Sequence, residues 1–123
     1  MRNILLVGFG GMCGAIARYS ISLFILQIIQ PPFAFFTILV INLAGCLGIG
    51  FVVGLGEGIL KPELRLLIVT GFLGGFTTYS AFAFDTSEFI TSQQYLVAAM
   101  NIVLHIAAGL VAVWVGSIVA RHL

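Results

Sequence analysis

The sequence predicts an all-α membrane protein with four transmembrane helices. Hydrophobic residues make up 61% of its 123 residues and charged residues only 7%, whereas a soluble domain carries about 25% charged residues. The mean hydropathy is +1.22. A chain this short has too much surface for its volume to bury so much apolar side chain alone. Lipid is therefore the expected solvent, and residues 1–123 are expected to form a single integral membrane domain.

Charge and motifs exclude several classes of function. The formal net charge of +1 argues against electrostatic binding of nucleic acid, which needs a basic face. The sequence contains no phosphate-binding loop, HExxH motif or GxSxG motif, so we expect no enzyme. Cys13 and Cys46 lie in apolar runs without metal-ligand spacing, and we interpret them as small buried hydrophobic residues.

Four stretches of the chain have the length and apolar character of membrane spans, which need about 20 residues. They cover residues 4–29, 33–55, 64–90 and 95–120. Short breaks separate them at Gln30-Pro31-Pro32, at the charged and glycine-rich residues 56–63, and at the polar residues 91–94. The first stretch begins like a signal peptide, but it is too long and contains Arg18, so we expect it to be retained.

Polar side chains inside the first two stretches are informative, because each costs free energy in lipid unless it is satisfied. Gly10 and Gly14 are spaced to let another helix approach closely. Arg18 lies roughly 21 Å into the first helix at 1.5 Å per residue. We expect it to face a wet vestibule, where it would attract an anion, or to extend toward the interface. Asn42 fits equally well an interhelical hydrogen bond and a donor lining a pore.

The third stretch contains adjacent glycines followed by Thr77-Thr78, a pattern that predicts a break in the third helix over Gly74–Thr78. Non-helical backbone at this depth persists only where it is buried in protein or lines a cavity. Its freed carbonyl oxygens would suit a hard cation. Tyr79 and Phe82 share a helical face. Their spacing favours core packing, although their positive ring edges could also hold a small anion.

The fourth stretch carries Asn101, His105 and Gly109 at four-residue intervals, which places them on one stripe of a helix. A lone histidine in a helix is more often a packing residue than a ligand. Next to an asparagine on the same stripe, His105 becomes a candidate for a polar track.

Together these features resemble the CrcB/Fluc family of fluoride channels along nearly the whole chain. Three motifs carry the resemblance: GGMCGAIARY at 10–19, NLAGCLGIG at 42–50, and the most specific, GFLGGFTTYSAF at 71–82. The resemblance implies an antiparallel, dual-topology dimer with two narrow pores in the cell membrane, through which fluoride leaves the cytoplasm passively. It also implies a structural sodium ion at the dimer centre.

The resemblance further assigns roles to individual residues. Main-chain oxygens of Gly74 and Thr77 would be the sodium ligands. The fluoride pathway would comprise Arg18, Asn42, Tyr79, Ser80, Phe82, Asn101 and His105.

The chain departs from the family pattern at several pathway positions. The first position of the aromatic pair, usually Phe, is Tyr79, and the glutamate that usually follows the pair is Asp85. The threonine one turn before the asparagine is replaced by Ile38, with Thr37 displaced by one residue. The fourth-span stripe has His105 where a hydroxyl residue is common. The sodium motif therefore matches the family while the pathway differs.

Two alternative functions follow from these residues. The altered pathway is compatible with a non-conducting subunit, or a heterodimer partner, of such a channel. The length and four spans also fit a small proton-coupled multidrug exporter. That class needs a carboxylate in its first span, where this chain has Arg18 and no acidic residue.

The distribution of Lys and Arg predicts a preferred orientation, because these residues concentrate on the cytoplasmic side. With four spans, both termini and the loop between the second and third spans share one side. That side carries Arg2, Lys61, Arg65 and Arg121. The opposite side carries no Lys or Arg, or only Arg18 if that residue is assigned to it. We expect both termini to be cytoplasmic, so the antiparallel partner is either a minority of inverted chains or a related subunit with the reverse bias.

Overall fold

The computed structural model describes residues 1–29, 35–56 and 58–122. Within these residues, four helices are long and apolar enough to cross a membrane. They cover Arg2–Ile28, Phe36–Gly54, Pro62–Thr91 and Tyr95–Arg121. The predicted all-α architecture with four membrane-spanning helices is confirmed. The predicted break at Gln30-Pro31-Pro32 and the start of the second span at Phe33 lie outside the described residues.

The first two spans are single helices, and the last two are assembled from several segments. The first pair is α1 (Arg2–Ile28) and α2 (Phe36–Gly54). The third span contains α3 (Pro62–Arg65), η2 (Leu66–Leu73), α4 (Gly74–Phe76) and α5 (Tyr79–Thr91). The fourth contains α6 (Tyr95–Val103), η3 (Leu104–Ala108) and α7 (Gly109–Arg121). The segments η2 and η3 are π-helical, a wider turn often found at functional sites.

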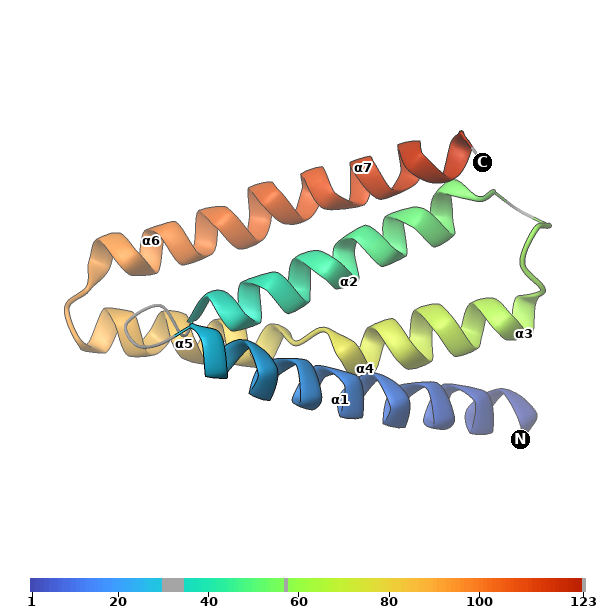
Figure 1. Cartoon of the computed structure of the whole chain (residues 1–123), viewed down its shortest axis with the longest axis horizontal. Helices are drawn as coiled ribbons and strands as arrows, with labels where there is room; N and C mark the ends of the chain where they lie inside the picture. Colours follow the sequence, from blue (N-terminus) through green and yellow to red (C-terminus); the bar gives the residue numbers. More distant parts are fainter. Residues whose placement is uncertain (30–34, 57, 123) are drawn as a thin grey trace.

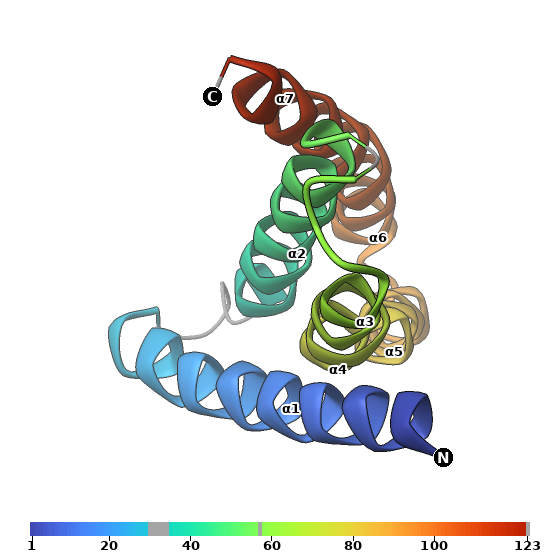
Figure 2. The same ribbon diagram turned by 90° about the vertical axis from the view of Figure 1, so that its right-hand side faces the viewer.

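The spans form two packed pairs. The helix α1 packs against η2 and α4 and crosses the third span at an angle, and α2 packs against α7 of the fourth span (Figure 2). Both termini and the connection from α2 to α3 lie at one end of the molecule, while the turn between α5 and α6 lies at the other (Figure 1). The two termini therefore share one side of the membrane.

Glycines bring the paired helices into backbone contact. A Cβ atom on Gly10 or Gly14 would meet the backbone of the third span, at Leu67 and Phe72 respectively. This agrees with the close approach predicted for these two glycines. On the other pair, a Cβ on Gly50 of α2 would meet the backbone of Val113 in α7. Such close approach is how helices gain packing energy in lipid.

The third span bends between α4 and α5. Thr77 (φ −83°, ψ 157°) and Thr78 (φ −147°, ψ 110°) have extended backbone, whereas Gly74–Phe76 is helical. The departure from helical geometry is therefore narrower than the break predicted over Gly74–Thr78. The bend lies between α1 and α2, near the middle of the molecule (Figure 1).

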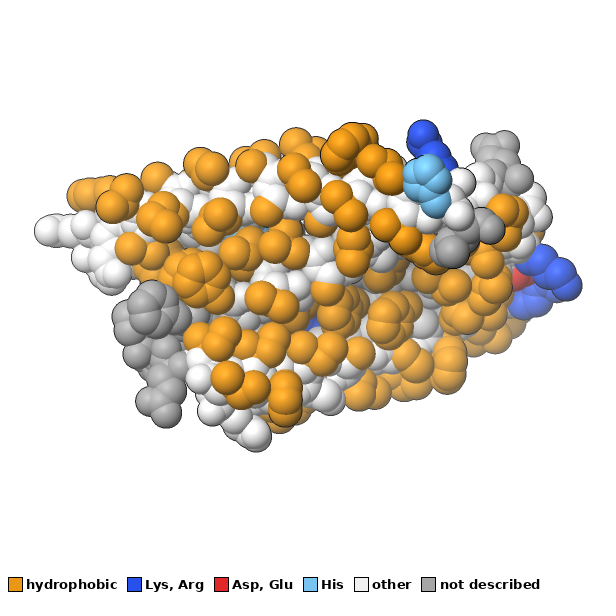
Figure 3. Space-filling model, turned by 45° about the horizontal axis from the view of Figure 1, so that its top comes forward, with side chains coloured by type: hydrophobic (Ala, Val, Ile, Leu, Met, Phe, Trp, Pro, Cys, Tyr) orange, Lys and Arg blue, Asp and Glu red, His pale blue; other side chains and the backbone are white. Residues whose placement is uncertain are grey.

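Apolar side chains cover most of the outside of the protein. Phe24 and Trp114 are examples, with 63% and 64% of their surface exposed. Figure 3 shows hydrophobic side chains spread over one face and most of the visible Lys and Arg at one end. There Arg2 donates to Glu63 at 2.6 Å. This distribution fits a multi-pass membrane protein whose long sides contact lipid.

The glycine contact between α2 and α7 makes a prediction about stability. We expect Gly50→Ala to lower the thermal midpoint in detergent, because the added methyl has no room and overpacking costs about 1–3 kcal/mol. Gly8→Ala is the matched control, since nothing lies within 4 Å of a Cβ there. That control should be neutral or slightly stabilising, as alanine favours a helix by about 1 kcal/mol over glycine. Equal midpoints for the two variants would contradict this packing.

Candidate functional site

An open cavity of about 420 Å³ lies between α2, the bent third span and the fourth span. Six of the nine residues predicted for the sodium site and fluoride pathway line it: Asn42, Gly74, Thr77, Tyr79, Phe82 and His105. The other three, Arg18, Ser80 and Asn101, lie outside its lining. Its lining includes no Lys, Arg, Asp or Glu in the described part of the chain. The cavity therefore offers neutral polar groups and aromatic rings, together with one imidazole.

The side chain of Asn42 pairs with the peptide groups of Thr78. Its Nδ2 donates to the Thr78 carbonyl at 3.1 Å, and the Thr78 N–H donates to its Oδ1 at 2.8 Å. The amide thus replaces the helical partners that the bend removes, and it ties α2 to the third span. Of the two roles considered for Asn42, the structure shows the interhelical hydrogen bond. An amide nitrogen carries two hydrogens, so one remains for a ligand.

Three further side chains satisfy the backbone around the bend. The Nε of half-buried Arg18 donates to the Gly75 carbonyl at 3.3 Å. The Thr77 hydroxyl and N–H both donate to the Leu73 carbonyl at 3.0 Å. The Thr78 hydroxyl accepts from the Ala81 N–H at 3.3 Å and caps α5. The carbonyls of Gly74 and Thr77 accept none of these bonds.

The fourth span contributes a buried polar cluster. Asn101 is only 1% exposed, and its Nδ2 donates to the Thr86 hydroxyl at 2.9 Å. That hydroxyl donates to the Phe82 carbonyl at 2.8 Å. The Nδ1 of His105 lies 2.9 Å from the Asn101 carbonyl. The sequence analysis missed Thr86, although its position one helical turn after Phe82 places it on the same face.

The two predicted aromatic residues lie against each other and against the histidine. The ring centroids of Tyr79 and Phe82 are 5.5 Å apart, with the planes tilted by 55°. The Phe82 and His105 rings are 4.4 Å apart, tilted by 41°. Tyr79, Phe82 and Thr86 also line a second hollow of about 470 Å³. The aromatic pair therefore stands between two cavities, and Tyr79 is 79% exposed.

Comparison with known proteins identifies the family. The model of the family described as "CrcB-like protein, Camphor Resistance (CrcB)" matches residues 5–117. The chain belongs to the CrcB family. It is 38% identical to a protein of Flavobacterium psychrophilum over the full length of both chains. It is 40% identical to a protein of Shewanella sp. (strain ANA-3) over 94% of each chain. Both relatives are named "Fluoride-specific ion channel FluC".

The CrcB match spans every predicted site residue, including those outside the cavity lining. Ser80 is exposed, with its hydroxyl 3.2 Å from that of Thr78. Thr37, the threonine displaced by one residue from the family pattern, is 3% exposed, and its hydroxyl has no hydrogen-bond partner among the described residues. Those residues contain no group of three or more His, Cys, Asp and Glu able to hold a metal.

Proposed function

We propose that this CrcB-family protein is a fluoride-specific channel through which fluoride leaves the cytoplasm passively across the cell membrane. The observation that carries the proposal is the cavity that gathers Asn42, Tyr79, Phe82 and His105 without an acidic side chain in its lining. The names of the relatives supply the identity of the anion. A passive path also fits a lining without the membrane-embedded carboxylate that a proton-coupled cation exporter requires.

Neutral groups replace the hydration shell of fluoride along this path. Fluoride is small and strongly hydrated, so a narrow path must offer hydrogen-bond donors and positive ring edges in place of water. The free amide hydrogen of Asn42 and the hydroxyl of Tyr79 are donors. The rings of Tyr79 and Phe82 supply edges. Conduction needs attraction strong enough for entry and weak enough for release, which neutral dipoles provide.

The proposed assembly is an antiparallel dimer with a structural sodium ion at its centre. The carbonyls of Gly74 and Thr77 fit such an ion, because neither accepts the hydrogen bonds around the bend and Gly74 is exposed on this chain. Oxygen ligands suit a hard cation. One chain supplies two oxygens, and a second copy related by a two-fold axis would supply two more. Sodium would fix the geometry of the bends and would not be transported.

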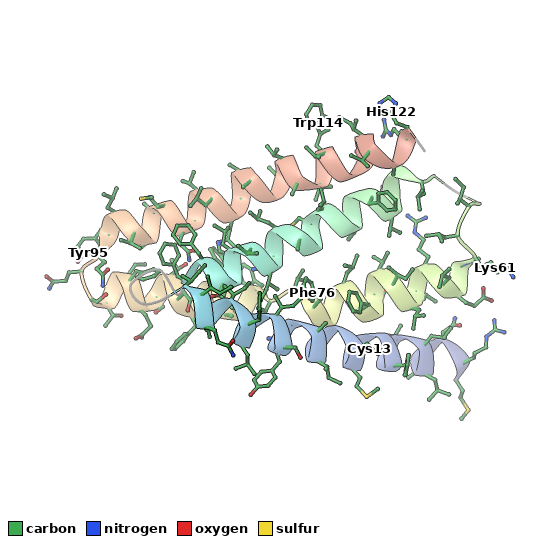
Figure 4. All side chains as sticks on the ribbon, in the orientation of Figure 1. Cys13, Lys61, Phe76, Tyr95, Trp114 and His122 are labelled. Atoms are coloured by element: carbon green, nitrogen blue, oxygen red, sulfur yellow. The ribbon has the colours of Figure 1, made fainter. Side chains whose placement is uncertain are left out.

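The second candidate function, a partner subunit, is favoured by the one-sided charge distribution. Lys61 and His122 lie at one end of the molecule and Tyr95 at the other (Figure 4). Arg2, Lys61, Arg65 and Arg121 all belong to the end that carries the termini. An antiparallel dimer then needs a chain inserted the other way. A related subunit with the reverse charge bias would supply it.

The fluoride path is tested by efflux from liposomes that contain only this chain, read with a fluoride electrode. We expect fluoride but not chloride to be released, and Asn42→Asp to reduce the rate at least about 100-fold. A carboxylate there repels the anion, and like charges 4 Å apart cost about 4 kcal/mol at an effective dielectric constant of 20. Asn3→Asp, at an exposed position in the first turn of α1, is the matched control and should conduct normally. Normal flux through Asn42→Asp would leave Asn42 as a packing residue only.

The sodium site is tested by paired glycine variants. A Cβ on Gly75 would clash with the Gly11 backbone, whereas a Cβ on exposed Gly74 lies 3.8 Å from its nearest neighbour. We expect Gly75→Val to disrupt the packing of α1. Gly74→Val should leave each chain folded but abolish the dimer, measured by crosslinking and by dependence of flux on sodium. Thr77→Ser should be tolerated, because residue 77 would bind sodium through its main-chain oxygen. A fully active Gly75→Val channel would contradict this account.

The orientation is tested by reporter fusions at the C-terminus. We expect a predominantly cytoplasmic signal, because the Lys and Arg bias at the terminal end sets the orientation. Adding two lysines between Ser92 and Gln93 should raise the external fraction, because it reduces the difference in Lys and Arg between the two ends. Comparable cytoplasmic and external signals from the unmodified chain would instead support a homodimer of oppositely inserted copies.

A further inference from the structure

The two halves of the fourth span pack against different neighbours. In α6, the buried Asn101 donates to Thr86 of α5 at 2.9 Å. In α7, a Cβ on the buried Gly116 would meet the backbone of Leu47 in α2. Figure 1 shows α6 and α7 along one edge of the molecule, with α5 and α2 beneath them. Both halves must therefore turn the same side of the span toward the protein interior.

An α-helix running through the whole span would not meet this requirement. Each residue of an α-helix turns the chain by about 100°, because about 3.6 residues complete a turn. Gly109 lies eight residues after Asn101, so an α-helix would turn it by about 80° beyond two full turns. Yet Gly109 is buried like Asn101, and a Cβ built on it would lie 3.6 Å from Sγ of Cys46 in α2. An element between the two residues must remove the excess rotation.

The π-helical turn η3 removes this excess rotation. It comprises Leu104–Ala108, five residues between α6 and α7. A π-helix bonds each residue to the fifth along the chain and turns by only about 82° per residue. Five residues therefore turn by about 90° less than they would in an α-helix, and about as far as four α-helical residues do. The turn thus holds one residue more than an α-helix would need to join the two halves.

We infer that η3 is a register adapter, a turn whose extra residue lets α6 face α5 while α7 faces α2. It also determines which side chains of the fourth span reach the cavity of about 420 Å³. Within the described residues, this span contributes His105 and Ile106 to the cavity lining, and both belong to η3. The inference concerns the packing of the chain. It goes beyond the proposed function, because it holds whichever ion the protein carries.

The test removes or adds one residue and measures the thermal midpoint and the elution profile in detergent. Deletion of Ala107, which is exposed in η3, leaves four residues that can complete the same rotation as an α-helix. We expect this variant to elute as one species and to keep its midpoint within about 5 °C of that of the unmodified chain. Its structure should show one continuous α-helix from α6 into α7.

An insertion and a matched deletion provide the contrast. An alanine inserted after Ala107 gives the turn a second extra residue, so α7 would rotate by about 100° and move Gly109 and Gly116 off α2. Deletion of Ala44 is the matched control, since this alanine is also exposed but lies within the unbroken α-helix α2. It would rotate the Asn42 end of α2 against the rest of that helix by about 100°. Both variants should lose more than about 10 °C of midpoint or fail to fold.

Deletion and insertion at the same place must therefore differ. A deletion of Ala107 as damaging as the deletion of Ala44 would show that η3 holds no spare residue, and it would overturn the inference. An insertion tolerated as well as the deletion would also overturn it, because the two halves would then not be fixed in register. None of these measurements uses fluoride, so the failure of the adapter and the failure of the channel are distinguishable.

Discussion

The architecture depends on satisfying backbone polar groups where the third span bends inside the membrane. Lipid offers no hydrogen bonds, so peptide groups outside a helix must find partners within the protein. The amide of Asn42 is the main solution, because it pairs with both the N–H and the carbonyl of Thr78. Arg18 reaches the Gly75 carbonyl from α1. The bend is thus held from two neighbouring helices, and removing either side chain would leave part-buried peptide groups without these partners.

Glycine contacts make these hydrogen bonds geometrically possible. A Cβ on Gly14 would meet the backbone of Phe72, and one on Gly45 would meet the side chain of Thr77. Because these two glycines have no side chain in that space, α1 and α2 can approach the bend closely. Asn42 lies three residues before Gly45 on the same helix face. The close packing of the helices and the hydrogen bonds to the bent backbone therefore occur at the same place, beside the cavity.

Features that depend on position along the chain could be predicted from the sequence. The four spans follow from hydropathy, and the close approach of Gly10 and Gly14 follows from their spacing. Features that depend on how one helix is rotated against another could not be predicted. The spacing of residues left the hydrogen-bond partner of Asn42 open. It gave no indication that Arg18 donates to Gly75 or that Asn101 donates to Thr86. The contact between the rings of Phe82 and His105, which come from different spans, likewise required the folded geometry.

The placement of fixed charge constrains how an anion can pass. Apart from Arg18, the Lys and Arg residues belong to the end that carries the termini, and Arg18 is engaged with a carbonyl. A permanent cation inside a narrow, low-dielectric cavity would bind an anion tightly and slow its release. An amide, a hydroxyl and ring edges attract it more weakly, which favours passage.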